Sequence, residues 1–231
     1  MLDLFIGAVA PAGDLTPAEV FIFKNNGNGT FTDSTEDSLL NTISKRHTFS
    51  AAFGDYDKDG DLDLFLTHWG SGLILAEQST EHLWRNNGDG TFTDVSTPAG
   101  ITQVFFEKQD FTFTPNWSDI NNDGFLDMLI AADFGTSRVF INQTDGTFLN
   151  TTTEVISDEN GMGAAVGDYD NDLDLDWFVS SIYDPNGVAE ANWGVSGNRL
   201  YNNNGSGVFE DVTVDAGVEH GFGAGGAVLQ T

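Results

Sequence analysis

Short apolar runs alternate along the chain with polar segments rich in Asp, Asn and Gly. Three of these runs, Leu64–Leu66, Met128–Ile130 and Trp177–Val179, each follow a strongly acidic segment. A short apolar run between turn-forming residues predicts a buried strand. Amphipathic helical periodicity is weak everywhere in the sequence, so the pattern predicts an all-β protein.

Two further features recur around the acidic segments. An apolar run precedes each of them, at Phe49–Phe53, Phe111–Thr114 and Met162–Val166. A strand, an Asn/Gly turn and a second strand follow, because Asn-Gly and Asp-Gly tolerate the positive φ of tight hairpin turns. The four copies of this hairpin are Phe21–Asp33, Leu83–Asp94, Val139–Phe148 and Leu200–Asp211.

One repeat unit therefore reads strand, acidic loop, strand, variable loop, strand, turn and strand. Its period is marked by Phe31, Phe92, Phe148 and Phe209, at intervals of 61, 56 and 61 residues. Four antiparallel strands in such a repeat are typical of a propeller blade. We expect one β-propeller domain over residues 1–231, with about four four-stranded antiparallel blades. The approximate units are 1–40 together with 217–231, 46–98, 110–153 and 160–214.

Two arrangements of the chain ends stay open. Leu2–Ala8 resembles the strand after an acidic loop, and Gly221–Val228 resembles the strand before one. Paired with each other, they would complete a fourth blade and close a small propeller. Alternatively they pair with other chains or with further blades, since an open strand edge invites pairing. We favour the second arrangement, a segment of a larger propeller or a self-associating piece.

The acidic segments Gly54–Asp63, Ser118–Asp127 and Gly167–Asp176 share one pattern, with side-chain oxygens at positions 1, 3, 5 and 9 counted from the first Asp. Carboxylates this close repel one another unless a cation lies among them. A hard cation with six to eight oxygen ligands suits this density, and Ca²⁺ is the usual one. The predicted metal ligands are Asp55, Asp57, Asp59, Asp61, Asp63, Asp119, Asn121, Asp123, Phe125, Asp127, Asp168, Asp170, Asp172, Asp174 and Asp176.

The EF-hand loop is the nearest general template, but its bidentate Glu at position 12 is absent here. That position holds Leu66, Ile130 or Val179, and apolar strands follow instead of helices. We therefore predict calcium loops carried between strands, with the Asp at position 9 in place of the Glu. Phe125 would bind only through its backbone carbonyl. An Asp-rich turn that binds nothing is the alternative, and three copies in the same phase argue against it.

The net charge and the composition limit the kinds of partner and the cellular locations that we expect for this protein. Lys and Arg number 8 against 36 Asp and Glu, which gives a formal net charge of −28. Nucleic acid is excluded as a partner because it requires a basic surface. Without Cys, disulfides and thiolate metal sites are absent. We expect no membrane insertion, since no run of about 20 apolar residues occurs. Low-affinity calcium sites fill where calcium is near millimolar, which favours an extracellular, periplasmic or cell-surface location.

The acidic loop between strands, followed by Asn-Asn-Gly-x-Gly-x-Phe, resembles the FG-GAP/VCBS repeat family, the calcium-bearing blades of integrin α-subunits and many secreted bacterial proteins. Gly54–Asp57 together with Arg85–Val95 is most similar to its UnbV/cartilage-acidic-protein branch. The resemblance covers nearly the whole chain. It implies a β-propeller with Ca²⁺ in the loop joining the first two strands of each blade. Leu173 departs from the pattern, because it stands where the loop glycine is expected, and we predict a weaker third site.

Other candidate sites carry weaker signals. His47, His68, His82 and His220 are scattered, and no recognisable catalytic triad is present. Trp69, Tyr183 and Trp193 lie in two variable loops, where aromatic rings beside Asp and Asn suit sugar stacking. The alternative is that Trp69 and Trp193 pack under their own loops.

We therefore expect a non-enzymatic, calcium-binding propeller that acts in binding or adhesion, or as a structural module. Its expected partners are calcium and a glycan or an extracellular protein, with self-association through open end blades as a further expectation. A carbohydrate-binding propeller and a polysaccharide-active enzyme with paired carboxylates are the two alternatives.

Overall fold

The computed structural model describes residues 3–8, 19–40, 48–69, 82–102, 111–183 and 196–219. The chain divides into two compact units, Met1–Asp110 and Phe111–Thr231, and each is described by itself. All regular elements assigned within the described residues are strands. The all-β fold class predicted from the sequence is therefore confirmed.

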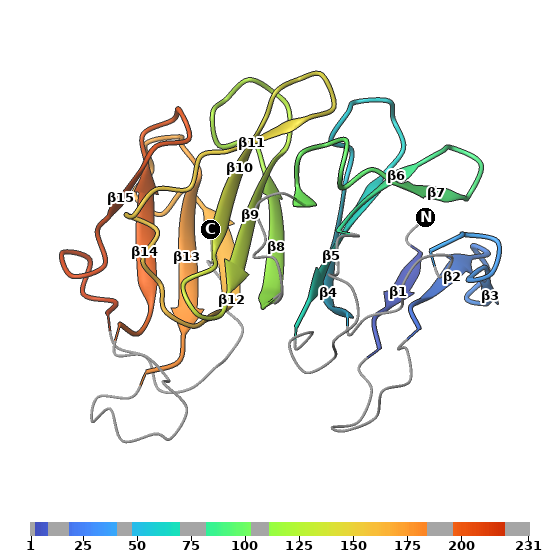
Figure 1. Ribbon diagram of the computed structural model, residues 1–231, viewed down its shortest axis with the longest axis horizontal. Helices are drawn as coiled ribbons and strands as arrows, with labels where there is room; N and C mark the ends of the chain where they lie inside the picture. The colour runs from blue at the N-terminus through green and yellow to red at the C-terminus, as the bar shows by residue number, and fades with distance from the viewer. Residues whose placement is uncertain are drawn as a thin grey trace. The chain divides into compact units, whose positions relative to one another are not determined.

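The first unit contains a three-stranded and a four-stranded sheet (Figure 1). Both are antiparallel, and their strands lie side by side in the order in which they occur along the chain. The three-stranded sheet consists of β1 (Leu4–Ile6), β2 (Phe21–Asn25) and β3 (Phe31–Asp33). The four-stranded sheet consists of β4 (Thr48–Gly54), β5 (Asp63–His68), β6 (Leu83–Asn86) and β7 (Phe92–Asp94).

The second unit contains two four-stranded antiparallel sheets of the same kind. The first consists of β8 (Thr112–Ser118), β9 (Asp127–Ala132), β10 (Arg138–Asn142) and β11 (Phe148–Asn150). The second consists of β12 (Gly161–Gly167), β13 (Asp176–Ser181), β14 (Arg199–Asn203) and β15 (Phe209–Asp211). Three sheets thus have the predicted four strands of a propeller blade. In the first sheet three strands are described, and Gly221–Val228, the expected fourth, lies outside the described residues.

The strand after each acidic loop lies inside its sheet and is almost entirely buried, as its continuous apolar run predicts. The strand before the loop lies at the sheet edge, and each of the three has a register shift near its start. The edge position explains how β8 includes Pro115, because an edge strand tolerates a missing N–H donor. β8 therefore extends to Ser118, beyond the apolar run recognised in the sequence.

Each unit has its own hydrophobic core between its two sheets. In the first unit, Ile22 of β2 packs in one cluster with Leu64, Leu66 and Trp84 of the neighbouring sheet. In the second unit, Leu129 and Val139 share a cluster with Trp177 and Tyr201. Within the described ranges, no helix is long and apolar enough to cross a membrane. The acidic loops join the first two strands of three sheets, at the rim of these cores.

Candidate metal centres

The Asp at position 9 of each loop is the first residue of a buried strand and is itself fully buried. Both of its carboxylate oxygens accept backbone N–H groups. Asp63 accepts from Asn86 at 2.9 Å and from Tyr56 at 3.2 Å. The equivalent pairs are Asn142 and Ile120 at 2.8 and 3.0 Å from Asp127, and Asn203 and Tyr169 at 2.9 and 3.1 Å from Asp176. These hydrogen bonds fix the carboxylate between its own loop and the hairpin of the same sheet.

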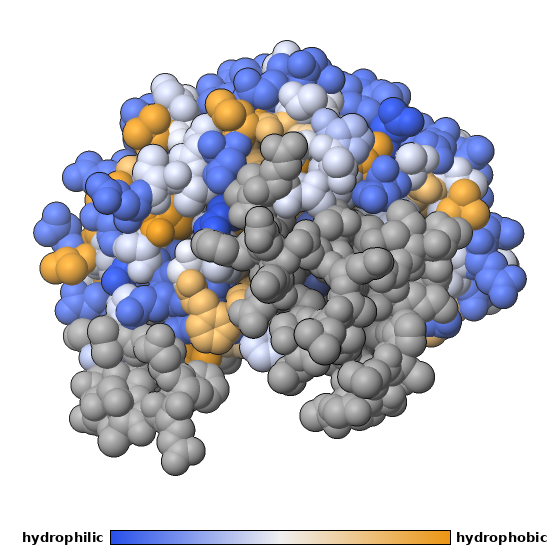
Figure 2. Space-filling view, viewed as in Figure 1, coloured by the Kyte–Doolittle hydropathy of each residue, from blue (hydrophilic) through white to orange (hydrophobic). Residues whose placement is uncertain are grey.

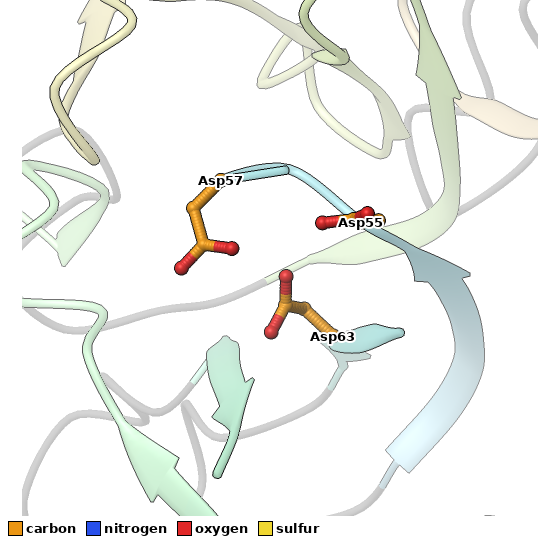
Figure 3. A group of neighbouring side chains, drawn as sticks. All are labelled: Asp55, Asp57 and Asp63. Atoms are coloured by element: carbon orange, nitrogen blue, oxygen red, sulfur yellow. The ribbon is translucent and has the colours of Figure 1, made fainter. Parts of the chain in front are cut away.

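Positions 1 and 3 bring two more carboxylates to the Asp at position 9. In the first loop, ligand oxygens of Asp55, Asp57 and Asp63 all lie within 4.8 Å of one another, and the three side chains face the same space (Figure 3). The third loop repeats this group with Asp168, Asp170 and Asp176. Three converging carboxylates, one of them fully buried, form an oxygen-only site for a hard cation.

The second loop has an amide where the other loops have a carboxylate. Asn121 donates from Nδ2 to Asp123 at 3.0 Å, while its Oδ1 accepts from the Asp123 amide at 3.1 Å. Asp119 and Asp127 hold the same hydrogen bonds as their equivalents in the other loops. The second loop therefore retains these hydrogen bonds with one carboxylate fewer at positions 1, 3 and 9, and Phe125 replaces a further Asp at position 7.

Positions 5 and 7 lie outside the converging group. The carboxylate at position 5 accepts the N–H of position 7 in every loop, at 2.8 or 2.9 Å. The carboxylate at position 7 lies against the hairpin turn: a Cβ built on Gly88 would be 2.8 Å from Asp61, and one on Gly205 would be 2.5 Å from Asp174. Of the five predicted oxygen ligands in the first and third loops, the structure thus brings three together.

Two residues of each loop have positive φ. Position 6 has φ of 97° at Gly60, 85° at Gly124 and 77° at Leu173, and in each loop its N–H donates to the Asp at position 1. Leu173 therefore adopts the conformation that glycine adopts elsewhere, and its side chain is 84% exposed. Position 4 also has positive φ, at Lys58, Asn122 and Asn171. The positive φ at position 4 was not predicted from the loop pattern, which singles out only position 6.

Burial makes the buried carboxylates poor acids. Desolvation raises the pKa of Asp63 to about 7, and repulsion from Asp57 and Asp59 adds to the rise. The pKa of Asp127 rises to about 6, also mainly through burial. The pKa values of Asp57 and Asp176 are raised with the same leading cause. The ionised loops are therefore electrostatically unfavourable by themselves, and a bound cation would reverse that balance.

The hairpin asparagines are functional residues that the sequence reasoning missed. Asn86 donates from Nδ2 to the Leu62 carbonyl at 3.1 Å, just before Asp63. Asn142 and Asn203 do the same to Leu126 and Leu175, also at 3.1 Å. Their recurrence before every turn was visible in the sequence, but turn chemistry alone accounted for it. Each one in fact holds the end of an acidic loop by a hydrogen bond.

Asp3 continues this pattern in the three-stranded sheet. It comes directly before β1, and its Oδ1 accepts the Asn25 amide at 2.8 Å. Asn25 is the hairpin residue equivalent to Asn86. This sheet therefore has one of the two contacts that hold the Asp at position 9 in the other sheets, although Asp3 is exposed.

The aromatic candidates lie apart from the metal loops. Trp69 packs with its ring centroid 6.2 Å from that of Phe49, on the strand β4 of its own sheet. Tyr183 is partly buried, next to Gly197, and Trp193 lies outside the described residues. His68 and His82, scattered in the sequence, approach to 5.1 Å between ring centroids. His82 is buried, stacks on Phe65 and bonds the Leu66 carbonyl through Nδ1, as a core residue would.

Repeated antiparallel sheets with an acidic loop before the second strand define an all-β repeat protein, and comparison with known proteins agrees. A family model described as an FG-GAP-like repeat matches residues 1–66, 73–130 and 119–179. The chain belongs to this FG-GAP-like repeat family, as its loop and turn motifs predict.

Relatives show the same similarity over a longer alignment. The chain is 27% identical over 193 residues to cartilage acidic protein 1 of Mus musculus and 26% identical over 193 residues to that of Homo sapiens. Each alignment covers 78% of this chain but only 28% and 27% of the relative. The relative from Xenopus tropicalis is 27% identical over 194 residues. The chain thus spans less than a third of the length of the relatives that it matches.

Proposed function

We propose that this protein is a non-enzymatic, calcium-stabilised module of an extracellular or cell-surface protein, with a role in binding or adhesion. The observation that carries the calcium assignment is the convergence of carboxylates at positions 1, 3 and 9, repeated in the first and third loops. Family membership supports it, because loops of this kind are expected to hold Ca²⁺. The name of the relatives, cartilage acidic protein 1, supports an extracellular setting.

Ca²⁺ would be held by the loop carboxylates and, at Phe125, by a backbone carbonyl. When bound, it would supply the positive charge that the loops lack. The chain's own contribution is positional: the buried Asp at position 9 is held by two N–H groups, and the position 1 carboxylate is held by the amide at position 6. An oxygen-only, flexible site of this kind favours Ca²⁺ over Mg²⁺, which demands a small octahedral cage.

Calcium binding is tested directly by isothermal titration of the metal-free chain. We expect binding at the first and third loops, and at the second with lower affinity because it has three carboxylates where each of the others has five. Asp55→Asn and Asp168→Asn, at position 1, should each remove one binding event. Asp145→Asn, at an exposed turn outside the loops, should remove none. Heats no larger than those of dilution, up to 10 mM Ca²⁺, would contradict the proposal.

A cleft in the first unit favours the binding role. It has a volume of about 510 Å³ and lies between the first two sheets. Phe53, Leu62 and Phe92 provide apolar walls, and Asp3 and Lys24 lie at its polar side. Apolar walls with a few convergent polar groups are typical of ligand sites. A ligand of the cleft can be sought by screening the protein against extracellular matrix proteins and against a glycan array. Phe53→Ser should weaken any interaction that uses the cleft.

The surface agrees with a soluble, acidic binding module. In the view of Figure 2, the described residues are mostly hydrophilic, with apolar residues in small groups. A glycan ligand, self-association through end blades and a polysaccharide-active enzyme stay separate hypotheses. Turnover of an acidic polysaccharide that survives mutation of the metal loops would favour the enzyme over a binding module.

A further inference from the structure

In the second unit, a chain of buried hydrogen bonds joins the two metal loops. Asp127 of the second loop accepts the Ile120 N–H at 3.0 Å. The carbonyl of the same Ile120 accepts from Asn203 Nδ2 at 2.7 Å. Asn203 in turn donates its backbone N–H to Asp176 of the third loop at 2.9 Å. The buried carboxylates of two loops are thus connected through two residues.

All four members of this chain have exposed fractions of 0%. Water does not reach these buried groups, so a broken hydrogen bond among them is not replaced by one to solvent. A displacement of one residue therefore costs free energy unless its partners move with it. Ile120 also packs in the core that unites the two sheets. The connection is therefore both polar and steric.

A second connection runs over the surface. Asn122, at position 4 of the second loop, donates from Nδ2 to Asp174 of the third loop at 3.0 Å. The same group approaches the carbonyl of Gly205 at 3.5 Å. The N–H of Gly207, in the same hairpin turn, donates to the Ile120 carbonyl at 3.0 Å.

The close approach of this turn depends on glycine. A Cβ on Gly207 would lie 2.8 Å from Ile141 Cδ1, and its φ is 72°. The hairpin that holds Asp176 is therefore seated directly on the second loop. Ordering one loop around an ion would order the surface on which the other is built.

We propose that the second and third loops bind Ca²⁺ as a coupled pair, with Ile120 and Asn203 as the residues that transmit the coupling. This rests on the proposed calcium function and adds positive cooperativity to it. An ion bound in one loop fixes the Asp at position 9 of that loop and restricts the motion of Ile120 and Asn203. The second ion then binds to a loop that is already ordered, so its binding costs less conformational entropy. The same coupling factor must appear in both directions.

The test reads each loop separately in the full-length, ¹⁵N-labelled protein. The amide signals of Gly124 and Leu173, at position 6 of the two loops, report Ca²⁺ binding at each loop. Asp168→Asn, which disables the third loop at position 1, should lower affinity at the second about tenfold, a typical size for coupling between sites. Asp119→Asn should lower affinity at the third loop by the same factor. Asp145→Asn removes the same charge from an exposed turn and should change neither affinity by more than about twofold.

Charge-neutral variants separate this connection from general electrostatics. Asn203→Ala cuts the buried route and Asn122→Ala cuts the surface route, and neither removes a carboxylate. Each should bring the coupling factor towards one; if Asn203→Ala does not fold, Asn122→Ala decides. Two outcomes would overturn the coupling while the calcium function stands. In the first, both loops bind Ca²⁺ and the affinity of each is unchanged when the other loop is disabled. In the second, the coupling factor is unchanged in the folded Asn203→Ala and Asn122→Ala variants. No response of either amide would refute the calcium function as well.

Discussion

The side-chain amide of Asn203 donates a hydrogen bond of 2.7 Å to the carbonyl oxygen of Ile120, 83 residues earlier in the chain. The same amide group also donates to Leu175, just before the buried Asp176. The last residue of β14 thus holds the acidic loop of its own sheet and that of the neighbouring sheet. One side chain therefore makes both a contact within its own sheet, to Leu175, and a contact with a residue distant in sequence, Ile120.

Leu173→Gly should stabilise the protein. Leu173 has φ of 77°, which costs a side-chain-bearing residue about 1–2 kcal/mol. Glycine removes this strain but gains freedom in the unfolded state, so we expect a net gain of about 0.5–1 kcal/mol. Because the strain lies in the backbone of the folded loop, the gain should appear in EDTA as well as in Ca²⁺. Denaturant unfolding measures it.

The matched control is Gly124→Leu at the same position of the second loop, where φ is 85°. It should lower the free energy of unfolding by about 1–2 kcal/mol. The two exchanges thus have opposite signs at equivalent positions. If both exchanges changed the free energy of unfolding in the same direction, backbone strain at position 6 would not be the main cause of the change.

Asn86→Ala should destabilise the first unit by about 1–2 kcal/mol. It removes the hydrogen bond to Leu62 and the one that Asn86 Oδ1 accepts from Gly88. Asn86→Asp should be no better than Ala, because a carboxylate would face the Leu62 carbonyl without a proton to donate. Asn87→Ala, which loses only exposed contacts within its own turn, should change stability by less than about 0.5 kcal/mol. Chemical unfolding that shows Asn86→Asp as stable as the parent would contradict the role of the donor.

Asp158 should make the second unit less stable as pH rises. It is buried, and desolvation raises its pKa above the ordinary 3.8, although Ser137 and Tyr201 donate to it. The folded state therefore binds this proton more tightly than the unfolded state. Its contribution is full below pH 3.8 and is lost as pH rises through the raised pKa.

Asp158→Asn removes this titration while keeping an acceptor for Tyr201. The difference in melting temperature, variant minus parent, should therefore become more positive between pH 4 and pH 8, measured in EDTA. Ser157→Ala is the neighbouring control, and its difference should not vary with pH. A difference that is flat or falls with pH in the Asp158 variant would show that this carboxyl is not protonated preferentially in the fold.

Much of the fold was predictable because its signals are local. The apolar run after each loop predicted β5, β9 and β13, and the Asn/Gly turns predicted every hairpin. Leu173 stands where the pattern has the loop glycine, and its φ is positive as at Gly60 and Gly124. The end of β8 was missed because Pro115 interrupts the strand pattern, and only its edge position makes it acceptable.

The site was predictable in composition but not in geometry. The sequence repeats side-chain oxygens at positions 1, 3, 5 and 9 and singles out only position 9, whereas the structure brings together positions 1, 3 and 9 in the first and third loops and turns position 7 towards the hairpin. The roles of Asn86, Asn142 and Asn203 depend on the register between strands, which turn chemistry does not reveal. The contact between Asn203 and Ile120 depends on how two sheets pack, and no pattern within one repeat encodes it.

The most direct measurement of the central claim is thermal unfolding of the full chain in EDTA and in millimolar Ca²⁺. Binding to the folded state alone stabilises by about 2.7 kcal/mol per site when free Ca²⁺ is one hundred times the dissociation constant. We predict a midpoint that rises with Ca²⁺ concentration, rises much less with Mg²⁺, and rises less in a variant with Asp55, Asp119 and Asp168 all changed to Asn. An unchanged midpoint from EDTA to 10 mM Ca²⁺ would contradict the account.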